Sequence, residues 1–161
     1  MANPLRQLLK RIAPAFVAAL LGGLPATLAQ AANILGEFYS NDVASNDASC
    51  NAGSCAVLFP PLPSGKGLAV TSVACTFRIV GGAASITEMR LYTLSAPSGF
   101  GTFLKPVLLS VVNSTRTYQS DDVVLHLVPV GSRPGVIFIA VNAQPGQLGP
   151  MRCHIAGILR P

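Results

Sequence analysis

Tryptophan is absent from this 161-residue chain, and aromatic and charged residues are scarce, at 6% and 11%. Sugar-binding sites commonly stack flat rings on the ligand, so this scarcity weakens the expectation of such a site, although Tyr92 and Tyr118 remain candidate contacts. Beyond the first eleven residues the basic residues are scattered singly, whereas a surface that follows nucleic-acid phosphates needs them clustered. The composition therefore argues against nucleic acid as a partner.

Motifs of established chemistry are also missing. The chain contains no G-x-S-x-G elbow, no G-x-x-x-x-G-K-[ST] loop and no H-E-x-x-H pair. Ser64-Gly65-Lys66-Gly67 differs from a phosphate loop because neither Ser nor Thr follows the lysine, and it predicts a turn. We expect no cofactor and no structural metal.

The N-terminus has the order of a secretory signal peptide. Arg6, Lys10 and Arg11 precede an apolar stretch over 12–28, and small residues end it at Ala31. A retained anchor would need roughly 20 uninterrupted apolar residues, but glycine and proline break this stretch. We expect cleavage after Ala31, a secreted or periplasmic product and no stable membrane span after cleavage.

Removal of residues 1–31 changes both size and charge. Eight of the eleven basic residues remain, against all six acidic ones, so the exported part is close to neutral. Residues 32–161 are enough to bury one hydrophobic core, and no linker divides them. We expect one domain.

All four cysteines lie in the exported part, which favours two disulfides in an oxidising compartment. Turn-forming residues separate Cys50 from Cys55, so we pair these two, which leaves Cys75 to pair with Cys153. Zinc is the alternative, but the C-x4-C spacing and two distant single cysteines do not fit common zinc sites.

Alternation of apolar and polar residues indicates strands, and helical periodicity is hard to find. Turn-forming residues separate the strands, which favours an all-β, antiparallel sandwich of about eight strands, with a jelly roll as one candidate topology. The runs Val107–Val112 and Val136–Val141 are almost wholly apolar, which predicts strands covered on both sides. The expected strands are 34–40, 55–59, 68–80, 88–92, 107–112, 123–127, 136–141 and 153–160.

Two histidines are candidates for chemistry. Alternation places His126 and His154 on the outward faces of their strands, with Val123, Leu125 and Leu127 facing inward. If the two strands were adjacent, the imidazoles could share a metal; surface histidines without a ligand are the ordinary interpretation. A hydrolase triad could also assemble from these histidines, Asp121 or Asp122, and a serine, because triads are defined in space.

Oxygen-bearing residues gather over 41–47, where Asp42 and Asp47 could contribute to a calcium site. The segment lacks the spacing of an EF-hand loop, and Asn and Asp commonly cap turns. We interpret this segment as a turn, and Asp121-Asp122 likewise. The weak binding candidates are Asp42, Asp47, Tyr92, Tyr118, Asp121, Asp122, His126 and His154.

Three hypotheses follow for function. The favoured one is an exported, non-catalytic module with a binding or structural role, whose partner is an envelope protein or a glycan. The alternative is a small secreted hydrolase or metal-dependent enzyme that uses His126, His154, Asp121 and Asp122, which requires these groups to converge. The third is self-association through an exposed edge strand.

Overall fold

The computed structural model describes residues 32–45, 50–51, 53–94 and 101–161, and these form ten strands and no helix. The prediction of an all-β antiparallel sandwich is confirmed. The expected signal peptide, its helix and its cleavage site lie outside the described residues.

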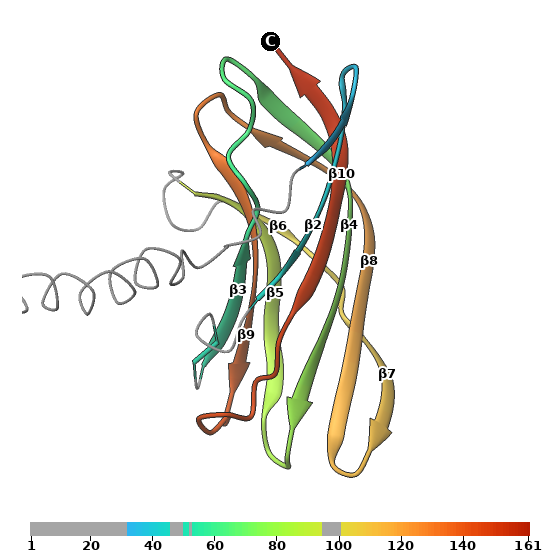
Figure 1. Cartoon of the computed structure of the whole chain (residues 1–161). Helices are drawn as coiled ribbons and strands as arrows, with labels where there is room; N and C mark the ends of the chain where they lie inside the picture. The colour runs from blue at the N-terminus through green and yellow to red at the C-terminus, as the bar shows by residue number, and fades with distance from the viewer. Residues whose placement is uncertain (1–31, 46–49, 52, 95–100) are drawn as a thin grey trace, which may run out of the picture.

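Six strands form the larger sheet, in the order β1-β2-β10-β4-β8-β7 (Figure 1). Every pairing in it is antiparallel, β10 and β4 are its two central strands, and the fourteen-residue strands β4 and β8 run side by side. Their bounds are β1 Asn33–Leu35, β2 Phe38–Ala44, β4 Gly67–Val80, β7 Val107–Val112, β8 Thr115–Val128 and β10 Arg152–Arg160.

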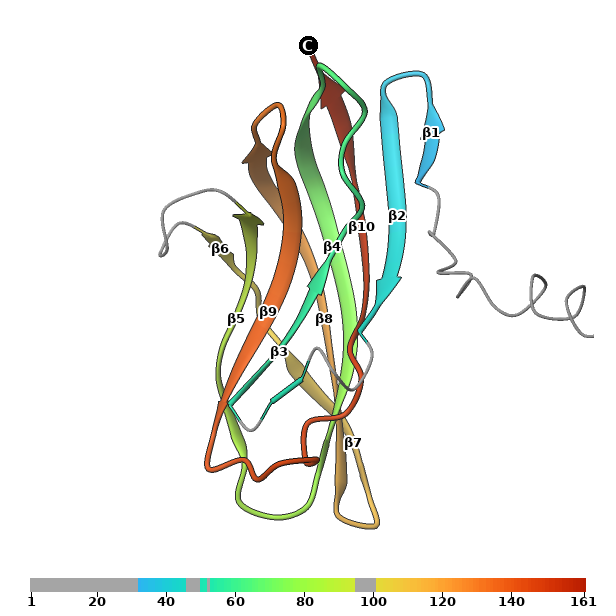
Figure 2. The same cartoon turned by 60° about the vertical axis from the view of Figure 1, so that its left-hand side comes forward.

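Four strands form the smaller sheet, in the order β3-β9-β5-β6, which faces the larger one (Figure 2). Their bounds are β3 Ser54–Leu58, β5 Ser85–Leu94, β6 Gly101–Phe103 and β9 Arg133–Val141. Both of its central strands, β9 and β5, carry large apolar side chains on the face that meets the larger sheet.

The strand order is that of a jelly roll with two additions. Without β1 and β7, the sheets read β2-β10-β4-β8 and β3-β9-β5-β6. The chain therefore passes from one sheet to the other between successive strands, except from β5 to β6, which are neighbours in the smaller sheet. β1 and β7 are hairpin partners of β2 and β8, and each adds one strand at an edge of the larger sheet.

The core lies between the layers. On β4, Val73, Cys75, Phe77 and Ile79 are buried and alternate with more exposed residues, as the sequence predicted. The Phe77 ring stacks on Phe138 of the other sheet, with centroids 4.4 Å apart. Alternate burial on both sheets therefore forms one continuous hydrophobic core.

The two sheets differ in width, and the edge strands of the larger one have no cover. All six residues of β7 and all three of β1 are exposed. The prediction that Val107–Val112 is covered on both sides is wrong, because β7 lies at an edge beyond the reach of the four-stranded sheet. In β9, Val136, Phe138 and Ala140 are buried, but Ile137 and Ile139 are only half-buried and Val141 is exposed. The prediction of cover on both sides is therefore wrong for Val136–Val141 as well, because only the face toward the larger sheet is buried.

Three local predictions also need correction. The single strand expected over 34–40 is the β1–β2 hairpin, with Gly36 at φ 61° in its turn. Asn41–Ala44 belongs to β2 rather than to a turn, and Asp121 and Asp122 lie within β8. Backbone pairing with neighbouring strands prevails over the turn preference of Asn and Asp at these positions.

Candidate functional site

Both predicted disulfides are present, Cys50–Cys55 and Cys75–Cys153. Cys75 and Cys153 are direct partners on β4 and β10, and both are buried. The long-range bridge therefore lies in the core but within one sheet, where it connects two neighbouring strands. Two disulfides are typical of chains that fold in an oxidising compartment.

His126 faces inward, so its predicted outward position is wrong. It is paired with Val70 on the buried face of β4, and Val128, two residues further on, is also buried. Period-two alternation was correct for this strand, but its phase was inverted. Val123, Leu125 and Leu127 are consequently exposed, at 95%, 75% and 67%.

Two threonines of the smaller sheet hold the His126 ring. Thr93 Oγ1 lies 2.9 Å from Nε2 and Thr102 Oγ1 lies 3.1 Å from Nδ1. In a neutral imidazole one nitrogen donates and the other accepts, so both contacts are satisfied without a charge. Burial lowers the pKa of His126, which keeps the ring neutral at lower pH than usual. This arrangement connects the two sheets.

His154 lies on the outward face, as predicted. Its Nδ1 is 3.3 Å from a carboxylate oxygen of Asp42 on β2, and both side chains are well exposed. In the antiparallel register Asp121 shares this face, separated from His154 by Ala74 of β4. Asp42 and His154 are thus the two predicted candidates that the fold brings into contact. Asp47 lies outside the described residues.

Asp122 faces inward and has a structural role. Its Oδ2 accepts hydrogen bonds from the Ser120 hydroxyl and, at 3.1 Å, from the Lys105 backbone N–H. These contacts hold the segment between β6 and β7 against β8. The four residues of the enzyme hypothesis therefore divide between two faces: Asp122 and His126 inside, Asp121 and His154 outside. They do not converge on one site.

The two tyrosine candidates pack against their own fold. Tyr118 stacks on Phe77, with centroids 5.4 Å apart and planes 6° from parallel. The Tyr92 ring lies over Gly135, where an added Cβ would approach the ring to 2.6 Å. Burial raises the pKa of Tyr92, and the nearby Arg133 opposes this to a smaller extent. Each ring therefore has one face packed against its own fold.

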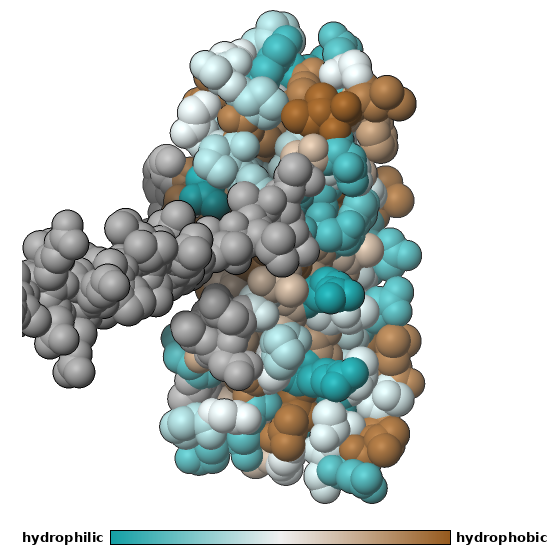
Figure 3. Space-filling model, in the orientation of Figure 1, coloured by the Kyte–Doolittle hydropathy of each residue, from teal (hydrophilic) through white to brown (hydrophobic). Residues whose placement is uncertain are grey.

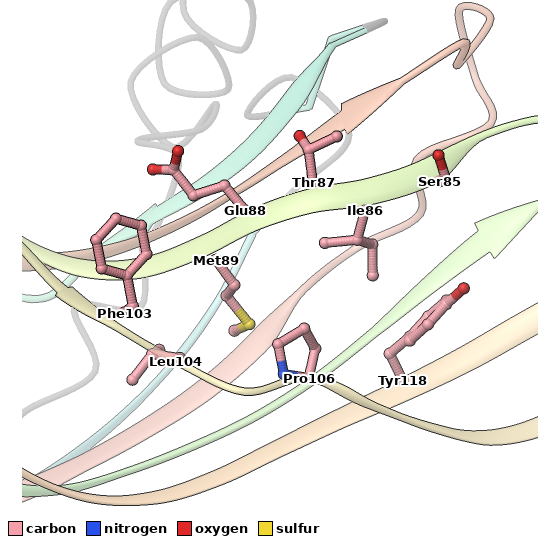
Figure 4. A pocket seen from close by; sticks show the side chains of 9 residues that line it. All are labelled: Ser85, Ile86, Thr87, Glu88, Met89, Phe103, Leu104, Pro106 and Tyr118. Carbon is pink, nitrogen blue, oxygen red and sulfur yellow. The ribbon is translucent and has the colours of Figure 1, made fainter.

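A cavity of about 330 Å³ opens between the sheets next to Tyr118 (Figure 4). Ile86 and Met89 of β5 point into it toward Pro106 and Tyr118, whereas Glu88 points away and pairs with Arg90 at 2.5 Å. Its inner wall is apolar, so the cavity can hold a small apolar group but presents no nucleophile with a neighbouring base. No pattern in the sequence predicts this cavity.

Two further features concern residues 32–45, 50–51, 53–94 and 101–161. No cluster of three or more His, Cys, Asp and Glu side chains in them is placed to hold a metal ion. None of the secondary structure in them is a helix of sufficient length and hydrophobicity to span a bilayer.

An apolar row crosses the outer face of the larger sheet. Direct partners in the register connect five strands through apolar residues only: Leu35, Phe38, Ile158, Ala69 and Leu127. Leu35 is 83% exposed and Leu127 67%, whereas the small Ala69 between Ile158 and Leu127 is buried. Together with Leu125 and Val123, these residues define what we call the outer apolar face. In Figure 3 hydrophobic colour gathers between the upper ends of β10 and the β1–β2 hairpin, and again at the lower right, where Figure 1 places β7.

The sequence does not predict this face, because its alternation of apolar and polar residues assigns Val123, Leu125 and Leu127 to the core. The register across five strands is not visible in any one segment. Comparison with protein-family models, with curated proteins and with solved structures gave no match. A jelly roll supports many unrelated functions, so function has to be inferred from the surfaces described above.

Proposed function

We propose that this chain is an exported, non-catalytic β-sandwich module with a binding or structural role in the cell envelope or outside the cell. The outer apolar face is the observation that carries the proposal. Monomeric soluble proteins seldom expose large contiguous apolar patches, and those that occur commonly mark interaction sites. An envelope protein is the partner that this surface favours over a glycan, because the row of direct partners that crosses it carries no polar side chain.

Two further observations support the proposal. The pair of disulfides agrees with folding in an oxidising compartment. The division of Asp121, Asp122, His126 and His154 between two faces removes the convergence that a hydrolase or metal-dependent enzyme built from them would need.

The binding role can be tested with matched variants of the mature, oxidised protein. Leu125→Ser/Leu127→Ser removes apolar side chains from the outer apolar face, and Val130→Ser/Val141→Ser removes exposed ones elsewhere. Immobilised wild type and the control pair should retain the same defined envelope component, and the outer-face pair should lose it. Equal retention by all three proteins, or none by wild type from envelope fractions and a glycan panel, would contradict the proposal.

Export is tested separately with the full chain. Cell fractionation should place the product outside the cytoplasm, and its N-terminal sequence should begin at Ala32. A cytoplasmic product that retains Met1 would refute export.

A further inference from the structure

β7 presents the longest bare edge in the described part of the chain. The other sheet edges are β1 and β6, with three residues each, and β3, which is partly buried. Proteins usually protect an edge by shortness, charge or proline. β7 has six residues, and all five of its large apolar side chains are between 47% and 62% exposed.

β7 and the residues next to it in the chain carry no charge that would repel another strand. No residue from Pro106 to Thr115 is charged. A neutral six-residue run of Val, Leu and Ser without glycine or proline is also the kind of segment that pairs readily with a copy of itself.

The register of β7 is compatible with pairing to itself. Val107 and Val112 face outward, because their partners on β8 are Gln119 and Thr115, whereas Leu108 faces inward opposite Tyr118. Val111 also faces inward, opposite Arg116. From either end of the strand, the first side chain therefore faces outward and the second faces inward.

We propose that two copies of this chain associate through antiparallel pairing of β7 with β7. A two-fold axis perpendicular to the sheet places Val107 opposite Val112 of the second copy, and Leu108 opposite Val111 of the second copy. Outward residues then meet outward residues and inward meet inward. The bulge at Leu109 lies beside the axis and is shared symmetrically.

Such a contact is isologous, so it closes as a dimer with one continuous twelve-stranded sheet instead of growing into a fibre. Six residues extend about 20 Å, and pairing over that length covers less than the roughly 800 Å² per partner of a standard interface. We therefore expect a reversible dimer with a dissociation constant in the micromolar range. The β7 residues that form this contact are not part of the outer apolar face.

The test introduces charged residues at positions that the predicted register pairs. The dimer Kd is measured by sedimentation velocity at micromolar to millimolar protein concentrations. Val107→Lys/Val112→Lys places lysine opposite lysine twice and should raise the dimer Kd by about tenfold or more. Val107→Glu/Val112→Lys places glutamate opposite lysine twice and should restore Kd to within about threefold of wild type. The control Val130→Lys/Val141→Lys adds the same charge elsewhere and should leave Kd unchanged.

Circular dichroism confirms folding of each variant before sedimentation, and exposed positions should tolerate these changes. The proposal is overturned by a wild-type monomer at every concentration, by a dimer indifferent to paired lysines, by failure of the Glu/Lys pair to recover, or by wild-type fibrils that bind thioflavin.

Discussion

β7 and β9 are similar as sequences and opposite as structures. Val107–Val112 and Val136–Val141 are both almost wholly apolar, yet every residue of β7 is exposed whereas β9 has strands on both sides and buries Val136, Phe138 and Ala140. The difference comes from the sheets: the smaller one is four strands wide and leaves β7 uncovered. An apolar run thus shows that a strand forms but not what covers it.

The largest expected effect concerns the covered centre of the larger sheet. Cys75→Ala/Cys153→Ala opens a loop of 78 residues and should lower the free energy of unfolding by about 4 to 5 kcal/mol in the chain-entropy model. Cys50→Ala/Cys55→Ala, with a separation of 5, should cost only about 2 kcal/mol. Guanidinium denaturation of both variants measures the contrast, and equal losses would show that loop length does not control it.

The next test breaks the covered strand directly. Phe138→Ala removes a fully buried ring that stacks on Phe77, and we expect a loss of about 3 to 5 kcal/mol in unfolding free energy. Urea denaturation with an unchanged m value gives the measurement. A loss below about 1 kcal/mol would mean that the centre of the sandwich is not packed as described.

His126 tests the region where the two sheets overlap. Because burial lowers its folded pKa, the unfolded chain takes up the proton first as the pH falls. Wild type should therefore lose stability as the pH falls below the ordinary imidazole pKa of about 6.5. Above that pH, His126 should not make the stability depend on pH.

His126→Gln should reduce that acid-side loss, at some cost in stability near neutral pH because the threonine contacts change. Melting temperatures on both sides of the ordinary imidazole pKa provide the comparison. An identical acid slope in the variant would assign the dependence to another group.

The smallest effect is expected at the uncovered edge. Leu109→Ala in β7 removes a side chain that is as apolar as many core side chains. In the folded protein, however, Leu109 is 56% exposed. The unfolding free energy of the monomer should change by no more than about 0.5 kcal/mol. Denaturation at low protein concentration, beside Phe138→Ala, measures it; a loss comparable to that of the phenylalanine would mean that β7 is covered after all.

The sequence predicted site features that depend on residues close together in the chain. It did not predict features that depend on which face of a strand is buried. The even cysteine count and the short spacing of Cys50 and Cys55 were enough to give both disulfides. The alternation around His126 gave a strand, but period two is symmetric, so choosing the apolar side as inward inverted it. The two ring nitrogens of the inward-facing His126 are hydrogen-bonded by Thr93 and Thr102 from other strands, which no local pattern reveals.

The sequence by itself determined the strand period, the punctuation by turns and the disulfide pairing, because these depend on nearby residues and on elimination among four cysteines. Tertiary structure alone decided which face of β8 is buried, that β7 is a bare edge, and that Leu35, Phe38, Ile158 and Leu127 form one row. The physical reason is that burial belongs to pairs of sheets and to register across strands, and residues far apart in the chain supply both.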